Sequence, residues 1–378
     1  MSIGLYIHVP FCLKKCSYCD FVSYVYEPAL AREYRTALIK EMELYSKRLP
    51  AGDKEVETLF IGGGTPTCLS TDDLVTILES CHYHFHLLPG AEISMEANPG
   101  TVDVEKLLAA HRAGVNRLSL GVQACQKRLL KLLGRIHSFS DAVEAVQAAR
   151  QAGFINFSMD LIFGIPGQEP EEWRYCLEQV TVLAPTHIST YGLQLEEDTP
   201  LWQEMQAGKI EPCSEEVELK MYEQAMEMLK TAGFEHYEIS NFALPGYQCR
   251  HNLRYWHNLP YLGLGPAAYS YLDHKRFNNE VSPGKYVHRI MTGELAVVEP
   301  EELPLCTSMA ETMILGLRLL EGLDLNAFAA RFGRQVEEVF AGQIRRLLEL
   351  GLVEFGEGVL RLTHKGLPVA NRVFVEFV

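Results

Sequence analysis

The sequence has no run of eighteen apolar residues, which excludes a helix that spans a membrane. It is also poor in basic residues: 34 Lys and Arg stand against 49 Asp and Glu, for a net charge of −15. A chain this acidic is a poor bulk binder of nucleic acid, because phosphate contact needs clustered Lys and Arg. The apolar first segment lacks the basic stretch of a secretion signal, so we expect a cytoplasmic protein.

Hydrophobic residues, by contrast, are plentiful: they make up 47% of the 378 residues, with 22% charged. This balance is typical of a globular protein with two or three domains. Ten cysteines are too few for a disulfide framework in a chain of this length, and cytoplasmic cysteines are more often reduced. A cluster of cysteines therefore indicates metal or redox chemistry.

Three of the cysteines, Cys12, Cys16 and Cys19, form a C-x3-C-x2-C run directly after the first predicted strand. Closely spaced thiolates can surround one compact metal centre, and soft sulfur ligands favour zinc or an iron–sulfur cluster. A centre held by the protein alone needs four ligands, yet Phe21 stands two residues after Cys19. On a four-iron cube, three ligands leave one iron open to a small molecule. A structural zinc site, or three unrelated buried cysteines, is the alternative interpretation.

The first half of the chain alternates short strand patterns with longer helical patterns, which implies parallel β/α units. Polar residues that can do chemistry follow the first five predicted strands in turn. An open doubly wound sheet gathers its site at one switch point, whereas a barrel gathers many strand ends at one mouth. We therefore predict an α/β fold with a partial (β/α)6 TIM-like barrel. The strands are expected at residues 3–9, 56–61, 91–96, 115–120, 154–162 and 186–193, and the helices between them at residues 28–48, 70–85, 103–113, 138–152 and 170–183.

The second half of the chain changes in character. After a helix at residues 214–232, a segment at residues 239–279 is rich in Gly, Asn and aromatics and is expected to be irregular. From residue 305 onward, helical runs precede two short strands joined by a Gly-containing turn, a pattern that resembles a winged helix. Its acidic surroundings favour packing or partner docking over DNA binding. The predicted domains are residues 1–235, 236–304 and 305–378.

Polar residues at the strand ends are candidates for one shared site. Gly63, Gly64 and Thr65 follow the second strand, and glycines let backbone groups approach a ligand closely. Glu96 and Asp160 end apolar strands, where an unpartnered charge is costly. Each feature alone is explained by a turn, a cap or an ion pair, but their recurrence at successive strand ends favours a common pocket. Gln123 and Arg135 follow the fourth strand.

These residues, with Tyr6, match motif positions of the oxygen-independent coproporphyrinogen III oxidase family of radical S-adenosylmethionine (SAM) proteins, which the chain resembles nearly end to end. The resemblance implies a radical-SAM barrel and a [4Fe–4S] cluster on the three cysteines, whose open iron chelates SAM. Cofactors of this kind carry the chemistry while the protein positions and tunes them. The SAM-binding residues it implies are Tyr6, Tyr18, Gly63, Gly64, Thr65, Glu96, Gln123, Arg135 and Asp160.

The family has an oxidase branch, which decarboxylates coproporphyrinogen III, and a haem chaperone branch, which binds haem and passes it on. The oxidase branch has a fourth cysteine where this chain has Phe21, and the first predicted strand here begins almost at Met1, without the oxidase's extension. Both departures favour the haem chaperone branch. The oxidase, or another radical SAM enzyme acting on tetrapyrroles, is the alternative. Whether the chain is an enzyme stays open, and no catalytic residue is assigned.

A segment near residue 251 resembles the chaperone's H-N-x-x-Y-W motif. His251 offers an imidazole for haem iron, Tyr255 and Trp256 can stack on the macrocycle, and Arg250 and Arg254 can pair with haem propionates. The alternative is that His251 caps a loop and the aromatics fill core.

The partners that follow from the resemblance are haem or a porphyrinogen, haem-accepting proteins, and a low-potential electron donor such as a flavodoxin. Lys14 and Lys15, between the cluster cysteines, can steer an acidic donor, although solvated charges explain them equally well. The resemblance also permits a homodimer.

Overall fold

The protein's structure is a computed structural model that describes residues 2–378, without the side chains of residues 51, 53 and 299. Its centre is a sheet in which six parallel strands lie in chain order. A doubly wound sheet reverses its strand order at a switch point, and these six strands do not. The predicted partial (β/α)6 barrel is therefore confirmed. The six strands are β1 (Ile3–Val9), β4 (Glu55–Gly63), β5 (His86–Ala97), β6 (Arg117–Gln123), β7 (Phe157–Phe163) and β8 (His187–Gly192).

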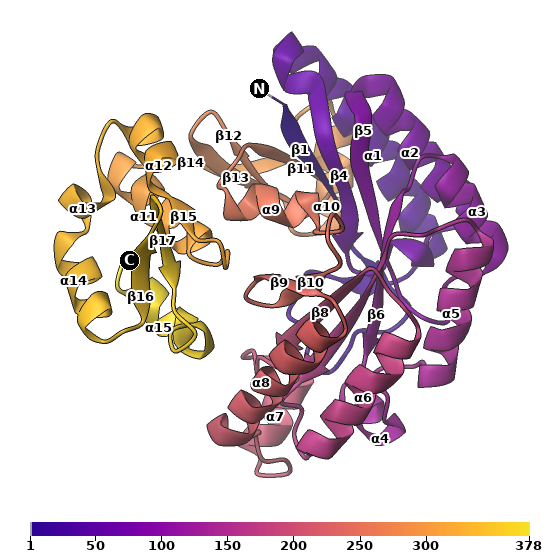
Figure 1. Cartoon of the computed structure of the whole chain (residues 1–378). Coiled ribbons are helices and arrows are strands. Elements are labelled where there is room, and N and C mark those ends of the chain that lie inside the picture. Colours follow the sequence, from indigo (N-terminus) through magenta and orange to yellow (C-terminus); the bar gives the residue numbers. More distant parts are fainter. Residues whose placement is uncertain (1) are drawn as a thin grey trace.

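Helices cover the outer face of the curved sheet, as Figure 1 shows. The five helices predicted between the strands and the following one are confirmed within a few residues, and Ser70 and Ser138 cap α2 and α5 through their side chains. Among the barrel helices, two of six and seven residues escaped prediction, α4 (Lys127–Leu132) and α7 (Pro200–Gln206), because they are too short to show a period. The confirmed helices are α1 (Pro28–Arg48), α2 (Thr71–His84), α3 (Val104–Arg112), α5 (Phe139–Gln151), α6 (Pro170–Val182) and α8 (Glu215–Thr231).

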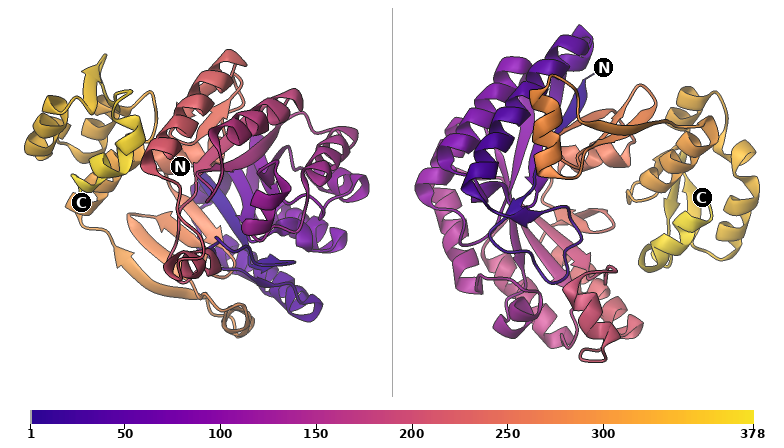
Figure 2. Two further views of the ribbon diagram at one scale, coloured as in Figure 1. Left: turned by 90° about the horizontal axis from the view of Figure 1, so that it is seen from below. Right: turned by 180° about the vertical axis from the view of Figure 1, so that it is seen from behind.

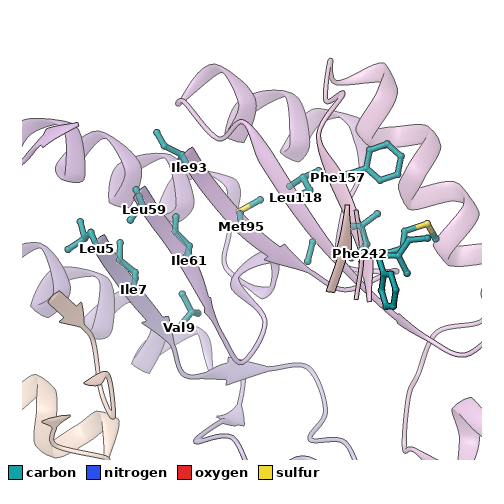
Figure 3. Packing of buried hydrophobic residues seen from close by; sticks show 14 of the residues in the cluster. Leu5, Ile7, Val9, Leu59, Ile61, Ile93, Met95, Leu118, Phe157 and Phe242 are labelled. Carbon is teal, nitrogen blue, oxygen red and sulfur yellow. The ribbon is translucent and has the colours of Figure 1, made fainter. Parts of the chain in front are cut away.

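The strands pack against these helices through alternate residues, because successive side chains point to opposite faces of a sheet. Leu5, Ile7 and Val9 of β1 are fully buried and belong to the same hydrophobic cluster as Leu59 and Ile61 of β4, as Figure 3 shows. The intervening residues therefore face the inside of the barrel. This alternation brings polar side chains of several strands into one chamber.

The sheet extends beyond the barrel at both edges, to twelve strands in all. The segment at residues 239–279, predicted to be irregular, contains four of these added strands and a helix, so that prediction is wrong. The added strands are three to six residues long, too short for a clear alternation. Beyond β1 come β11 (Tyr261–Leu264), parallel to it, then β12 (Tyr269–Leu272), β13 (Lys275–Asn279) and β14 (Val297–Glu302); beyond β8 come β10 (Asn241–Ala243) and β9 (Glu235–Glu238); the helices here are α9 (Arg250–Trp256) and α10 (Pro283–Met291).

A buried carboxylate ties this extension to the barrel. Glu41 of α1 is fully buried, and its Oε2 accepts hydrogen bonds from the Gly265 amide (2.8 Å) and the Tyr286 hydroxyl (2.7 Å). Its Oε1 accepts one from Nδ2 of Asn279 (2.7 Å). Burial raises the pKa of Glu41 to about 7 and outweighs these three donors, which lower it. The folded protein thus holds a proton on Glu41 that the unfolded chain releases near pH 4.5.

This proton makes stability depend on pH. The contribution of Glu41 to the free energy of unfolding is fully present below about pH 4.5 and is lost as the pH rises to about 7. In Glu41→Gln, which stays neutral, we expect a flatter dependence. Thermal unfolding of the apoprotein at pH 5 and pH 8 tests this. The midpoint of the wild type should fall further from pH 5 to pH 8 than the midpoint of the variant. Equal losses would contradict a raised pKa at Glu41.

The C-terminal elements form a separate module on the concave side of the sheet, as both views in Figure 2 show. The predicted helices followed by a hairpin are confirmed: β16 and β17 pair antiparallel across a turn at Glu357 and Gly358, and β15 adds a third strand. The domain boundaries at residues 235 and 304 stay predictions; the twelve-stranded sheet continues across the first of them. The module contains α11 (Leu305–Gly316), β15 (Leu323–Asp324), α12 (Leu325–Phe332), α13 (Val336–Val339), α14 (Ala341–Glu349), β16 (Val353–Gly356), β17 (Val359–Leu362) and α15 (Ala370–Val375).

The remaining elements are short. They are two strands, β2 (Phe11–Cys12) and β3 (Tyr24–Val25), and three 3-10 helices, η1 (Ala51–Lys54), η2 (Pro66–Cys68) and η3 (Leu367–Val369). Across residues 2–378, every helix is too short or too polar to cross a membrane.

Candidate cluster and cofactor site

A cavity of about 550 Å³ opens at the carboxyl ends of the barrel strands. We call it the barrel chamber. Its wall includes all three cysteines of the C-x3-C-x2-C run and all nine residues predicted to hold SAM. Residues that lie up to 154 positions apart in the sequence, from Tyr6 to Asp160, are thus brought together. The lining residues from these predictions are Tyr6, Cys12, Cys16, Tyr18, Cys19, Gly63, Gly64, Thr65, Glu96, Gln123, Arg135 and Asp160.

Backbone hydrogen bonds between β2 and β3 hold the two ends of the cysteine loop together. β2 and β3 run parallel, with the amide of Tyr24 donating to Pro10 O and that of Tyr26 to Cys12 O, both at 2.8 Å. All three cysteines are half-buried. No three His, Cys, Asp or Glu side chains within residues 2–378 are arranged around a single metal ion. An iron–sulfur cube makes a different demand, because each cysteine ligates a different iron.

Positive charge and hydrogen-bond donors face two of the sulfurs. Nη1 of Arg135 lies 3.5 Å from Sγ of Cys16, and Oγ1 of Thr65 lies 3.5 Å from Sγ of Cys12. A nearby guanidinium stabilises thiolate, the form that ligates metal. Burial raises the pKa of Cys19 to about 11, with smaller contributions from Cys16 and Cys12. Metal binding must therefore displace a proton from this thiol. The donor set fits an iron–sulfur cluster.

The glycine loop, residues 63–65, contacts the backbone of residues 9–11, directly before Cys12. The Gly64 amide donates to Val9 O (2.8 Å), and the Thr65 amide donates to Phe11 O (2.7 Å). A Cβ on Gly64 would lie 2.5 Å from Phe11 O, closer than any side chain tolerates. Gly63 adopts φ +103, and a Cβ there would lie 2.5 Å from the imidazole of His8. Glycine is required at both positions.

A hydrogen-bonded network links this loop to the next strand ends. Oε2 of Glu96 accepts from the Gly63 amide (3.0 Å). Nη2 of Arg135 donates to Oδ1 of Asn98 (2.5 Å), and Nδ2 of Asn98 donates to Oγ1 of Thr65 (2.7 Å). Burial, and next the charge of Asp160, raise the pKa of Glu96 to about 8. Sequence reasoning missed Asn98, although it lies directly after β5 and follows Glu96 by two residues, the spacing that places side chains on one side of an extended chain.

The inner wall of the barrel chamber is built from alternate residues of β6, β7 and β8. Asp160 accepts hydrogen bonds from the hydroxyls of Ser119 (2.8 Å), Ser158 (2.9 Å) and Ser189 (2.7 Å), one from each strand. These serines were not predicted, yet their spacing of two from other chamber residues is a signal that identifies them. Three donors hold the Asp160 carboxylate at a fixed position.

Arg117, at the start of β6, was also missed. It is 2% exposed, lines the barrel chamber and, among the described residues, forms no ion pair. A buried guanidinium without a carboxylate partner is costly unless a ligand supplies one. Arg117 is therefore a candidate for contact with an anionic group of a bound molecule.

Gln123 ends β6 in a left-handed conformation, with φ +67. The register of β6 against β7 shifts between Gly121 and Gln123, which marks a bulge there. Such strained positions cluster at functional sites because they re-aim a side chain. On the opposite wall, the Tyr6 hydroxyl pairs with Nδ1 of His8 at 3.0 Å.

The predicted haem segment forms α9, and only some residues of this helix line the barrel chamber. His251 and Tyr255 line the barrel chamber, but His251 is 1% exposed, with Nδ1 bonded to the Thr58 hydroxyl (2.8 Å) and Nε2 to the Tyr255 hydroxyl (2.9 Å). Burial lowers its pKa to about 3, so the imidazole is neutral. Its role as a haem ligand stays a prediction.

The other three predicted haem residues have partners within the protein. Arg250 and Arg254 both pair with Glu57, at 3.1 and 2.6 Å. Trp256 lies beneath the guanidinium of Arg318, 4.3 Å from the ring centre. The Arg254 side chain is 7% exposed and that of Arg250 is 45% exposed, and their roles toward haem propionates stay predictions.

Comparison with known proteins agrees with this geometry. Residues 6–180 match the Radical SAM superfamily and residues 303–369 match the HemN C-terminal domain. The protein named Heme chaperone HemW of Bacillus subtilis is 37% identical, over 99% of this chain and 98% of its own length. The chain belongs to the HemW family of radical SAM proteins. This membership implies a [4Fe–4S] cluster and SAM as its cofactors.

HemW relatives extend beyond bacteria. The bovine protein named Radical S-adenosyl methionine domain-containing protein 1, mitochondrial, is 32% identical over 99% of this chain and 87% of its own length. Among solved structures, the coproporphyrinogen III oxidase HemN of Escherichia coli superposes with a TM-score of 0.87, covering 100% of this chain and 90% of that one, at 24% identity. HemN and this HemW-family chain therefore share their fold.

Proposed function

We propose that this chain is a haem chaperone that binds a [4Fe–4S] cluster, SAM and haem, and delivers haem to haem-requiring proteins. The observation that carries the proposal is the near full-length similarity to Heme chaperone HemW of Bacillus subtilis, 37% over 99% of the chain. Phe21 supports it. It is 58% exposed at the mouth of the barrel chamber, where the oxidase branch of the family has a fourth cysteine.

Within the barrel chamber, Cys12, Cys16 and Cys19 would hold three irons of the cluster. The fourth iron, once SAM is bound to it, supplies one-electron chemistry at the sulfonium group. The chain's own residues position the ligand: Glu96, whose Oε2 already accepts from the Gly63 amide, offers its other carboxylate oxygen as an acceptor. The remaining predicted contacts are Tyr6, Tyr18, Gly64, Thr65, Gln123, Arg135 and Asp160.

The proposal extends to partners. Lys14 and Lys15 are exposed beside the cysteine loop, and Lys14 lines the barrel chamber. They would attract an acidic low-potential electron donor of the flavodoxin kind. A cytoplasmic location and a homodimer are further parts of this hypothesis.

Haem titration tests the proposed function. The cluster-loaded chain, titrated anaerobically, is expected to develop a Soret band that saturates at about one haem per chain. On mixing with apomyoglobin, haem should leave the chain and appear as holomyoglobin. An unchanged spectrum throughout the titration would reject the proposal.

A parallel assay addresses the oxidase. The same preparation is incubated with coproporphyrinogen III, SAM and a reductant, and no protoporphyrinogen is expected. Its formation would show a decarboxylase instead of a dedicated chaperone.

A further inference from the structure

Helix α9 separates two cavities. Its residues His251 and Tyr255, one turn apart, line the barrel chamber. Trp256, with His257 directly after the helix, lines a second cavity of about 1040 Å³. This second cavity, which we call the α9 cavity, lies between α9, the β12–β13 hairpin and the C-terminal module. The H-N-x-x-Y-W segment thus faces both spaces.

The walls of the α9 cavity are mainly apolar and aromatic. Its volume lies at the upper end of the roughly 300–1,000 Å³ of small-molecule sites, which suits a large flat ligand. The barrel chamber, at about 550 Å³, is half this size and is committed to the cluster and SAM. The apolar wall of the α9 cavity includes Trp256, Leu259, Tyr271, Leu272, Leu323 and Phe328.

Two imidazoles lie at the α9 cavity. His257 follows α9, and His274 is the second residue of the tight turn between β12 and β13. Both are exposed, and neither ring has a hydrogen-bond partner within residues 2–378. Free imidazole nitrogens are the commonest protein ligands of haem iron. Asp273 and His274 adopt φ +50 and +61, a left-handed turn that holds the imidazole at the cavity.

The α9 cavity also offers one cation. Nη1 and Nη2 of Arg331 donate to Asn258 O and to the Tyr271 hydroxyl, both at 2.9 Å. In the described part of the chain, Arg331 forms no ion pair, so its charge remains available to a carboxylate. Asp324 is occupied in capping α12. The three acidic residues of the wall, which would turn propionates toward Arg331, are Asp273, Glu321 and Asp324.

We propose that haem binds in the α9 cavity, with His257 and His274 as candidate iron ligands and Arg331 beside a propionate. The inference rests on the proposed chaperone function and names the site of its cargo. It differs from the sequence prediction of His251, whose two nitrogens are both engaged and whose ring is buried. A third cavity, of about 580 Å³, lies between the two: it shares Asn258 and Tyr271 with the α9 cavity, and Tyr6 and Glu96 with the barrel chamber. Haem in the α9 cavity would therefore be separated from the cofactors by this third cavity.

The test uses the full chain with its cluster, and records haem binding as a difference spectrum against the same protein without haem. The double variant His257→Ala/His274→Ala removes both ligands. Ala327→Trp, at an exposed position of α12 that lines the α9 cavity, fills the space and leaves both histidines in the sequence. Both are expected to weaken haem binding by about tenfold or more, and the double variant to lose the wild-type Soret position.

Matched controls change the same residue types elsewhere. His364→Ala and Ala341→Trp lie at exposed positions outside the α9 cavity and should bind haem as the wild type does. His251→Ala should also retain binding. Wild-type affinity in both the double variant and Ala327→Trp, or loss of binding confined to His251→Ala, would overturn the assignment. A wild-type chain that binds no haem would overturn the proposed function itself, and this inference with it.

Discussion

Replacing any one of Cys12, Cys16 or Cys19 with alanine is expected to abolish the cluster. Anaerobic reconstitution of the wild type should give about four irons per chain, and each variant should retain almost none. The reason is that three protein ligands already leave one corner open, so a further loss leaves a cube with two corners unattached to the protein. Iron and sulfide content, with the electron paramagnetic resonance of the reduced protein, measures the outcome.

Cys68 provides the matched control. It ends η2, directly after the glycine loop, and burial, followed by the nearby Cys12, raises its pKa to about 11. Among the described residues, however, it does not line the barrel chamber. Cys68→Ala should therefore keep the full iron content. Iron lost from Cys68→Ala, or retained in Cys19→Ala, would show that another ligand set holds the metal.

Gly64→Ala is expected to have the second largest effect. The new methyl group would lie 2.5 Å from Phe11 O and 2.9 Å from Phe11 N, both backbone atoms that no rotamer change can move. The strand bearing Cys12 must shift, which costs about 1–3 kcal/mol of stability or more. The shift also moves a cluster ligand and the SAM loop together. SAM affinity should fall by about tenfold or more, equal to about 1.4 kcal/mol.

Gly284→Ala separates crowding from the general effect of removing a glycine. Apart from its chain neighbours and the backbone of its own helix, no described atom lies within 4 Å of a Cβ built at Gly284, and its φ is not positive. SAM affinity should match the wild type there, and stability should be equal or slightly higher, because alanine favours the helix α10 in which Gly284 lies. Denaturant unfolding and equilibrium dialysis with labelled SAM measure both quantities. If Gly64→Ala bound SAM normally, the close approach of the glycine loop would have no part in the site.

The barrel could be read from the sequence because its elements carry local signals. β1 and α1 have the predicted bounds, Ile3–Val9 and Pro28–Arg48. β1 is a buried apolar run, and α1 begins with proline and is long enough to show its period. The chamber followed from strand order, since the ends of parallel strands converge at one mouth. Motifs at the ends of successive strands were therefore enough to predict that these residues gather in one chamber, although no contact between them was known.

The rest depends on contacts that a local pattern does not encode. Tyr261–Leu264 forms β11 between β12 and β1, and β1 lies about 250 residues earlier. Arg117 and Ser189 become chamber residues through the curvature of the sheet, and each alone is typical of an ordinary strand. The haem segment shows the same limit: its motif pointed to a ligand but not to a helix, and only the packing of the C-terminal module reveals that Trp256 and His251 line different cavities.

The pairing of β1 with β11 has a consequence for biosynthesis. β1 leaves the ribosome long before its partner, and one of its edges has no neighbour until residues 261–264 have been translated. At about 5–20 residues per second, that delay lasts roughly ten seconds to a minute. Throughout it, the nascent chain carries an unpaired apolar strand edge of the kind that recruits other chains. Assembly of the cysteine loop, which follows β1 directly, thus begins before the scaffold that supports it is complete.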